Sequence, residues 1–203
     1  MITPVVHRKA SRYLKKTDRT LGKIIEKTGV LEWEFSGNYF LDLTSSIVQQ
    51  QLSIKAGDTI WKRFIALFPD NKPTPELVIA IDGQKIRDAG ISWSKNSYIK
   101  DLARHVLESG IVFEQFEIMT DEEIITELIK VKGIGRWTAE MFLMFSMGRP
   151  DVFSYGDLGL RKSIKRLYGF DKEPTKEEAE KIAEKWKPYR TIACRYLWRS
   201  LEL

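Results

Sequence analysis

The stretch of sequence that decides the fold reads Leu128-Ile129-Lys130-Val131-Lys132-Gly133-Ile134-Gly135-Arg136-Trp137-Thr138-Ala139, and Gly156-Asp157 follow further along the chain. The pattern predicts a short helix, a turn with two glycines and a second helix. Glycine suits such a turn because it reaches positive φ and lets a ligand approach the backbone. The start of the second helix leaves N–H groups without intrahelical partners, which favours a bound phosphate. An acidic residue after such a turn, on a basic chain, indicates chemistry beyond adhesion to a polyanion.

Composition sets broad limits on the class of protein. The chain has 203 residues, of which 43% are hydrophobic, and a net charge of +5. These values are typical of a globular protein with a real core, and the charge alone favours a polyanionic partner only weakly. Cys194 is the single cysteine, which excludes disulfide scaffolds and cysteine-clustered zinc sites. Without an apolar signal core or a bilayer-length apolar stretch, we expect no membrane partner and an intracellular location, in the cytoplasm with the nucleoid or in the nucleus.

Helix signals dominate the chain. Apolar residues recur at three- and four-residue spacing, and no stretch alternates convincingly, so we predict an all-α fold. Only residues 30–40 and 111–113 hint at extended chain. The expected helices begin at Asp18, at Asp42 or Thr44, at Ser53, at Thr74-Pro75, at Ser94 or Lys95, and at capping boxes in residues 120–123 and 175–178.

Four features together carry a resemblance to a known family. They are the two-glycine hairpin, Trp137, the Gly-Asp-Leu-Gly-Leu-Arg-Lys run at 156–162 and the Trp-Lys-Pro-Tyr-Arg run at 186–190. With these, the chain resembles the helix–hairpin–helix DNA glycosylase superfamily, in its alkylbase branch of the 3-methyladenine DNA glycosylase II type. The likeness extends from about Leu43 to Trp198.

The resemblance implies a two-lobed helical fold with a DNA-binding cleft between the lobes. Residues 40–112 would form one helical lobe. Residues 1–39 plus 113–203 would form the second, which carries the hairpin (about 121–148) and the catalytic aspartate.

Asp157 is the candidate catalytic residue. Cleavage of an N-glycosidic bond makes the sugar resemble an oxocarbenium cation, and a carboxylate can stabilise that charge and activate a water. The alternative is that Asp157 only caps the helix that follows it. Both roles can hold at once, and the hairpin upstream favours catalysis.

Trp137 distinguishes two reaction types. In glycosylase/lyase relatives a lysine at this motif position attacks the sugar as an amine nucleophile. A tryptophan cannot form a Schiff base, so the resemblance implies hydrolysis by water and disfavours a lyase. Without the resemblance, a core indole is an equally good interpretation of Trp137.

A flipped base requires a pocket for stacking. The resemblance implies a base pocket that contains Trp137, Trp198, Met141 and Tyr155. Met141 stands where a bacterial family member has a tyrosine. Core packing is the alternative for Trp198, Met141 and Tyr155, and for Met141 it is the favoured one. Alkylated purines carry positive charge, which electron-rich rings attract, and a charged base leaves without a general acid.

The DNA contacts follow from the hairpin. We expect Gly133, Gly135 and Thr138 to present N–H donors to phosphate, with added charge from Lys132 and Arg136. Gln51, with Leu52 beside it, corresponds to the family's wedge, which fills the gap left by the flipped base. A polar helix end is a nearly equal alternative for Gln51.

The resemblance also implies a monovalent cation, Na⁺ or K⁺, on the backbone carbonyls of Ile129, Val131 and Ile134. No cofactor is required, and one cysteine cannot hold the iron–sulfur cluster of some relatives.

The sequence thus predicts a monomeric, monofunctional DNA glycosylase for base excision repair. It would excise alkylated purines of the 3-methyladenine or 7-methylguanine type from damaged double-stranded DNA, by base flipping and water attack at C1′. The alternative is a non-catalytic helix–hairpin–helix DNA-binding protein, which would show salt-sensitive binding and no base release.

Overall fold

The computed structural model of the protein describes residues 2–108 and 110–203, and among these residues the regular secondary structure is entirely helical. The all-α prediction is confirmed. Of the two hints of extended chain, residues 30–38 and 111–112 have irregular backbone, residues 39–40 are helical, and residue 113 begins a 3₁₀ turn at Phe113–Glu117. In chain order the α-helices are α1 (Pro4–Thr17), α2 (Arg19–Thr28), α3 (Tyr39–Gln49), α4 (Ile54–Ile65), α5 (Pro75–Ala80), α6 (Gly83–Asp88), α7 (Trp93–Leu107), α8 (Asp121–Leu128), α9 (Arg136–Phe145), α10 (Leu158–Tyr168), α11 (Lys176–Ala183) and α12 (Arg190–Ser200). Short 3₁₀ turns also occur at Pro69–Asn71 and Glu184–Trp186. No helix among the described residues is both long enough and apolar enough to cross a bilayer.

Most of the caps that the sequence predicts do begin helices. The Asp18 carboxylate accepts the N–H groups of Thr20 and Leu21 at the start of α2. Thr120 and Thr175 open α8 and α11 with complete capping boxes, in which the cap and the third helical residue bond each other's backbone. Each such cap stabilises the helix by about 1 kcal/mol.

Two helices begin earlier than predicted. The cap of α3 is Asn38, whose side chain accepts the N–H of Leu41 at 3.0 Å. Asp42 lies inside the helix, where its carboxylate accepts a hydrogen bond from the hydroxyl of Ser36. The cap of α7 is Ser92. Both stretches contain several cap-type residues in succession, and the correct one is the residue with extended backbone, which sequence does not reveal.

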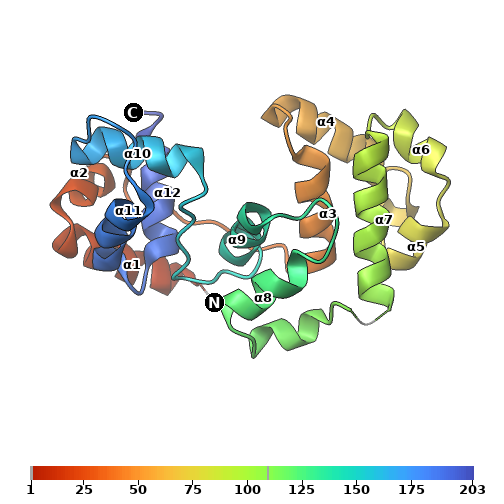
Figure 1. The fold of residues 1–203 in the computed structure, drawn as a ribbon, viewed down its shortest axis with the longest axis horizontal. Coiled ribbons are helices and arrows are strands. Elements are labelled where there is room, and N and C mark those ends of the chain that lie inside the picture. The colour runs from red at the N-terminus through yellow and green to blue at the C-terminus, as the bar shows by residue number, and fades with distance from the viewer. Residues whose placement is uncertain (1, 109) are drawn as a thin grey trace. The chain divides into compact units, whose positions relative to one another are not determined.

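By contacts between residues, the chain separates into two compact units. We call residues 36–142 the inserted unit, and residues 1–35 together with 143–203 the terminal unit. In the inserted unit α7 packs along α3 and α5, and α4 packs on α3 (Figure 1). Its core contains the fully buried side chains of Leu43, Ile47, Phe64, Ile99 and Leu102.

This division differs from the predicted boundaries in residues 36–39 and 113–142, which group with residues 40–112. The ring of Phe142 lies 5.3 Å from Tyr39 and 6.2 Å from Phe116, centroid to centroid. The buried carboxylate of Asp101 in α7 accepts the backbone N–H of Lys132 at 2.9 Å. These contacts attach the hairpin to α3 and α7.

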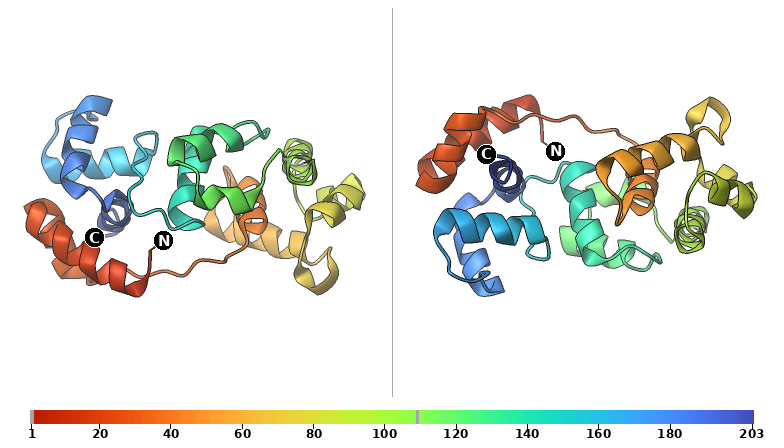
Figure 2. Two further views of the ribbon diagram at one scale, coloured as in Figure 1. Left: turned by 90° about the horizontal axis from the view of Figure 1, so that it is seen from below. Right: turned by 90° about the horizontal axis from the view of Figure 1, so that it is seen from above.

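In the terminal unit α12 contacts α1, α2 and α10 (Figure 2). The buried carboxylate of Asp18 joins distant parts of the chain, because it also accepts the hydroxyl of Tyr168 at 2.6 Å and the indole N–H of Trp186 at 2.9 Å. Burial, reinforced by the bond to Asp18, raises the pKa of Tyr168, so its phenol stays protonated as a donor.

Candidate active site

Asp157 stands at the start of α10 and caps that helix. Its Oδ1 accepts the backbone N–H of Leu160 at 2.8 Å and the indole N–H of Trp198 at 2.8 Å. The carboxylate is half-buried. The structure therefore brings together two of the predicted site residues, Asp157 and Trp198. The capping role of Asp157 is confirmed, and its catalytic role stays a prediction.

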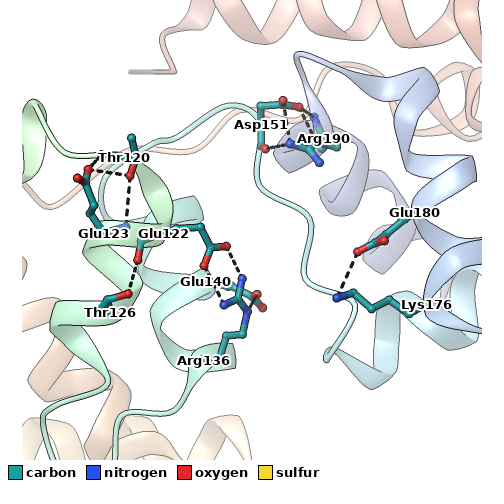
Figure 3. A network of polar contacts seen from close by, with 10 residues as sticks. All are labelled: Thr120, Glu122, Glu123, Thr126, Arg136, Glu140, Asp151, Lys176, Glu180 and Arg190. Carbon is teal, nitrogen blue, oxygen red and sulfur yellow. Dashed lines mark hydrogen bonds and ion pairs between the residues drawn. The ribbon is translucent and has the colours of Figure 1, made fainter.

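The backbone that leads to Asp157 is fixed against the start of α12, the helix that carries Trp198. The guanidinium of Arg190 donates to both carboxylate oxygens of Asp151, at 2.8 and 3.0 Å, as Figure 3 shows. The hydroxyl of Thr191 donates to the carbonyl of Arg149 and accepts the N–H of Val152. Two groups on α12 thus hold the loop that precedes the carboxylate.

A glycine allows the contact between Trp198 and Asp157. A Cβ on Gly159 would lie 3.0 Å from Cδ1 of Trp198 and 3.1 Å from Oδ1 of Asp157. The indole also packs on the ring of Phe145, with centroids 5.7 Å apart. The position of Trp198 is therefore fixed from both sides.

The side chain of Tyr155 makes its contacts with residues of the terminal unit. Its hydroxyl donates to the carbonyl of Pro174 at 3.1 Å, and the guanidinium of Arg161 lies 5.6 Å from its ring centroid. Its predicted place in the base pocket stays a prediction.

The inserted unit contains a pocket of about 630 Å³ between α3, the turn after it and the hairpin. Four predicted site residues, Trp137, Met141, Gln51 and Leu52, line it. Trp137 is 46% exposed, which rules out the core-indole interpretation, and Met141 is half-buried. The other lining residues are Ser45, Ser46, Gln49, Gln50, Gly133 and Thr138.

The polar wall of this pocket was missed by sequence reasoning. The amide of Gln49 donates to the hydroxyl of Ser45 at 2.7 Å, one helical turn earlier on α3. The sequence did contain a signal for this wall. Ser45 and Gln49 are four residues apart, so they share one polar face of a helix whose other face has the buried Leu43, Ile47 and Val48.

The hairpin connects α8 to α9 as predicted. Gly133 has φ +82°, and a Cβ there would collide with the ring of Tyr98, so glycine is required on both counts. The N–H of Lys132 is directed to Asp101, and the carbonyl of Gly133 accepts the amide of Gln50 at 2.9 Å. Space around Gly135 is open, since an added Cβ would meet no atom within 4 Å.

Arg136 lies between two carboxylates. Its guanidinium pairs with Glu122 of α8 and donates from Nε to Glu140 at 2.9 Å (Figure 3). The hydrogen bond to Glu122 is the main reason that the pKa of Arg136 is raised. The side chain thus braces the two helices of the hairpin, and its contact with phosphate stays a prediction.

No cluster of three or more histidine, cysteine, aspartate or glutamate side chains suited to a metal occurs in the described part of the chain. The carbonyls expected to hold a monovalent cation belong to Ile129, Val131 and Ile134. These residues flank the left-handed turn, and the carbonyl of Val131 also accepts the N–H of Ile134 at 3.1 Å.

Comparison with known proteins identifies the class. Residues 44–188 match the family described as HhH-GPD superfamily base excision DNA repair protein, and this chain belongs to that family. The family prediction and its alkylbase branch are confirmed.

Among its relatives, the Bacillus subtilis protein YfjP is 37% identical over 77% of this chain, which spans 56% of YfjP. The alkylbase DNA glycosidase-like protein mag2 of Schizosaccharomyces pombe is 31% identical, over 97% of this chain and 95% of its own length. The fold is similar to that of the S. pombe 3-methyladenine DNA glycosylase Mag1 in complex with abasic DNA. The TM-score is 0.86 at 33% identity, over 96% of this chain and 97% of that one.

Proposed function

We propose that the protein is a monofunctional DNA glycosylase that excises alkylated purines in base excision repair. The observation that carries the proposal is the Asp157 carboxylate, held at a helix start by the N–H groups of Leu160 and Trp198, in a chain of this family. A fixed carboxylate of this kind suits a reaction in which positive charge develops on a sugar.

The reaction follows from this chemistry. The damaged nucleotide leaves the duplex, since the N-glycosidic bond of a stacked base is out of reach. As that bond breaks, its electron pair leaves with the base, and Asp157 stabilises the oxocarbenium-like sugar. A water oxygen then bonds to C1′ while the carboxylate takes up the water's proton, which leaves an abasic site.

The residue at motif position 137 supports hydrolysis without strand cleavage. A lyase needs an amine that bonds covalently to C1′. The indole of Trp137 has no nucleophilic amine, and the side chain lines a pocket with Met141.

Cationic purines are the substrates that these residues suit best. The exposed face of Trp137 attracts a charged ring by roughly 0.5–2 kcal/mol. A charged base is also a good leaving group, so Asp157 can act without a general acid. Neutral lesions are expected to be poorer substrates.

The partner is damaged double-stranded DNA, and the protein acts on it as a monomer. It works in the nucleoid or the nucleus, where the cellular DNA is found. The hairpin contacts phosphate through backbone N–H groups near Gly135 and Thr138. Gln51 and Leu52 fill the gap in the duplex. The carbonyls of Ile129, Val131 and Ile134 hold Na⁺ or K⁺, for which neutral backbone oxygens are suitable ligands.

The test is incubation of the protein with methylated duplex DNA, followed by chromatography of released bases and borohydride trapping. We expect free 3-methyladenine and 7-methylguanine, abasic sites and no trapped complex. Salt-sensitive binding with no released base would overturn the proposal, and a trapped covalent complex would refute its monofunctional part.

A further inference from the structure

The turn that follows α3 is strained at its tip. Gln50 has φ −49° and ψ 134°, Gln51 has φ +57°, and the N–H of Leu52 donates to the carbonyl of Gln49 at 3.2 Å. These values define a type II β-turn, whose third position normally holds glycine because its φ is positive. A glutamine there is disfavoured relative to glycine, because its Cβ crowds the backbone at positive φ.

Lys95 holds this turn from beneath. Its ammonium donates to the carbonyl of Val48 at 2.8 Å and to the carbonyl of Gln50 at 2.7 Å, both at the C-terminal end of α3. Lys95 itself lies in the first turn of α7, where the helix dipole disfavours a cation, whereas the end of α3 favours one. Burial lowers the pKa of Lys95, so its placement has an electrostatic cost that the two carbonyls offset.

The turn is also attached to the hairpin, since the amide of Gln50 donates to the carbonyl of Gly133. The backbone that leads to the tip is therefore held by Lys95 and by the hairpin, while the side chains of Gln51 and Leu52 remain exposed at the pocket. A surface turn that is held in this way can keep two exposed side chains in place when another molecule pushes against them.

We propose that Lys95 is a positioning residue for base extrusion, which keeps the strained turn rigid so that Gln51 and Leu52 can stay inserted in the duplex. This inference rests on the proposed function. Unstacking and unpairing a nucleotide costs a few kcal/mol, and the wedge must resist that force. An unsupported turn can relax out of its positive φ and withdraw the wedge.

The chain provides a matched control on the same helix. Lys100 of α7 donates to the carbonyls of Ile79 and Ile81 at the end of α5, away from the pocket. Lys95→Met and Lys100→Met each remove one ammonium that caps a neighbouring helix. Lys95→Arg keeps the charge and the donors.

The full protein is tested in single-turnover excision of 7-methylguanine, either paired with cytosine or mismatched with thymine, where extrusion is easier. We expect Lys95→Met to reduce excision of the paired lesion by roughly 10- to 100-fold, in line with the cost of extrusion, and of the mismatched one far less. Lys100→Met should affect both substrates within about twofold, and Lys95→Arg should recover most of the loss. In a Gln51→Ala background, Lys95→Met should add little.

Melting temperatures show whether the variants fold. If Lys95→Met does not fold, Lys95→Gln, which removes the charge but keeps one donor group, is tested in its place. Its excision of the paired lesion should likewise fall more than its excision of the mismatched one. An equal loss on paired and mismatched lesions, or a loss no larger than that of Lys100→Met, would overturn the proposal.

A second measurement separates this inference from the proposed function. The fluorescence of 2-aminopurine opposite a stable abasic analogue rises when the wedge enters, whether or not a base is released. If the wild-type protein releases no base, the proposed function is refuted. A fluorescence rise that is equal in wild type and Lys95→Met would end the inference about Lys95.

Discussion

Substitution of Asp157 can separate its structural role from its chemical one. Asparagine caps helices as well as aspartate does, and its Oδ1 can accept the same N–H groups of Leu160 and Trp198. Asp157→Asn should therefore leave the free energy of unfolding unchanged within about 0.5 kcal/mol. Asp157→Ala removes the cap, which costs about 1 kcal/mol, and leaves the half-buried indole N–H of Trp198 without this acceptor, which costs about 1 kcal/mol more.

These values translate into melting temperatures and rates. For a chain of this size, a loss of about 2 kcal/mol lowers Tm by roughly 4–8 °C. Excision of 7-methylguanine under single-turnover conditions should fall by about 10²- to 10³-fold in both variants, because both lose the negative charge. An Asp157→Asn protein that melts like wild type and excises like wild type would refute the catalytic role. One that melts like Asp157→Ala would refute the capping argument.

Three further substitutions test other parts of the structure. Gly133→Ala should cost roughly 2–4 kcal/mol of unfolding free energy in urea, since a Cβ collides with Tyr98 at positive φ, and a change below about 0.5 kcal/mol would contradict this. Gly159→Ala should keep the fold but lower kcat about tenfold, because the new methyl displaces Trp198 by a few tenths of an ångström; an unchanged kcat would count against that alignment. Burial lowers the pKa of His7, so the unfolded chain binds its proton more readily than the folded one. Stability should therefore fall as pH drops below about 6.5, by at most about 1.4 kcal/mol per pH unit for this group. Denaturation of His7→Phe at pH 7.5, 6 and 5 should lack that part of the slope, and an identical slope would show that other groups cause it.

Local signals were readable from the sequence because the interacting groups lie within one helical turn. The capping boxes at Thr120 and Thr175 are of this kind, and so is the bond from Asp157 to Leu160. The hairpin was equally clear, since glycine is the residue that reaches the positive φ of a tight turn, and two glycines stand between two helical segments. The ion pair of Arg136 with Glu140, one turn ahead, could have been found by the same rule.

Long-range contacts were not readable without the fold. Nothing near Lys95 in the sequence indicates that its ammonium reaches the end of α3, and the partner of Trp198 is known only once α10 and α12 pack together. The family resemblance named Trp198 as a site residue. The bond that joins its indole N–H to the Asp157 carboxylate is seen only in the folded structure.

The contacts of Asp18 with Tyr168 and Trp186 can form only late in the synthesis of the chain. Asp18 leaves the ribosome well before Tyr168 and Trp186, its partners in the terminal unit. Residues 36–142 can complete their own core in the meantime, whereas the contacts of α1 and α2 with α12 must wait until residues 190–200 have been made. The surfaces of α1 and α2 that meet α12 thus stay uncovered until that helix has been made, and apolar surface exposed on an incomplete chain favours aggregation.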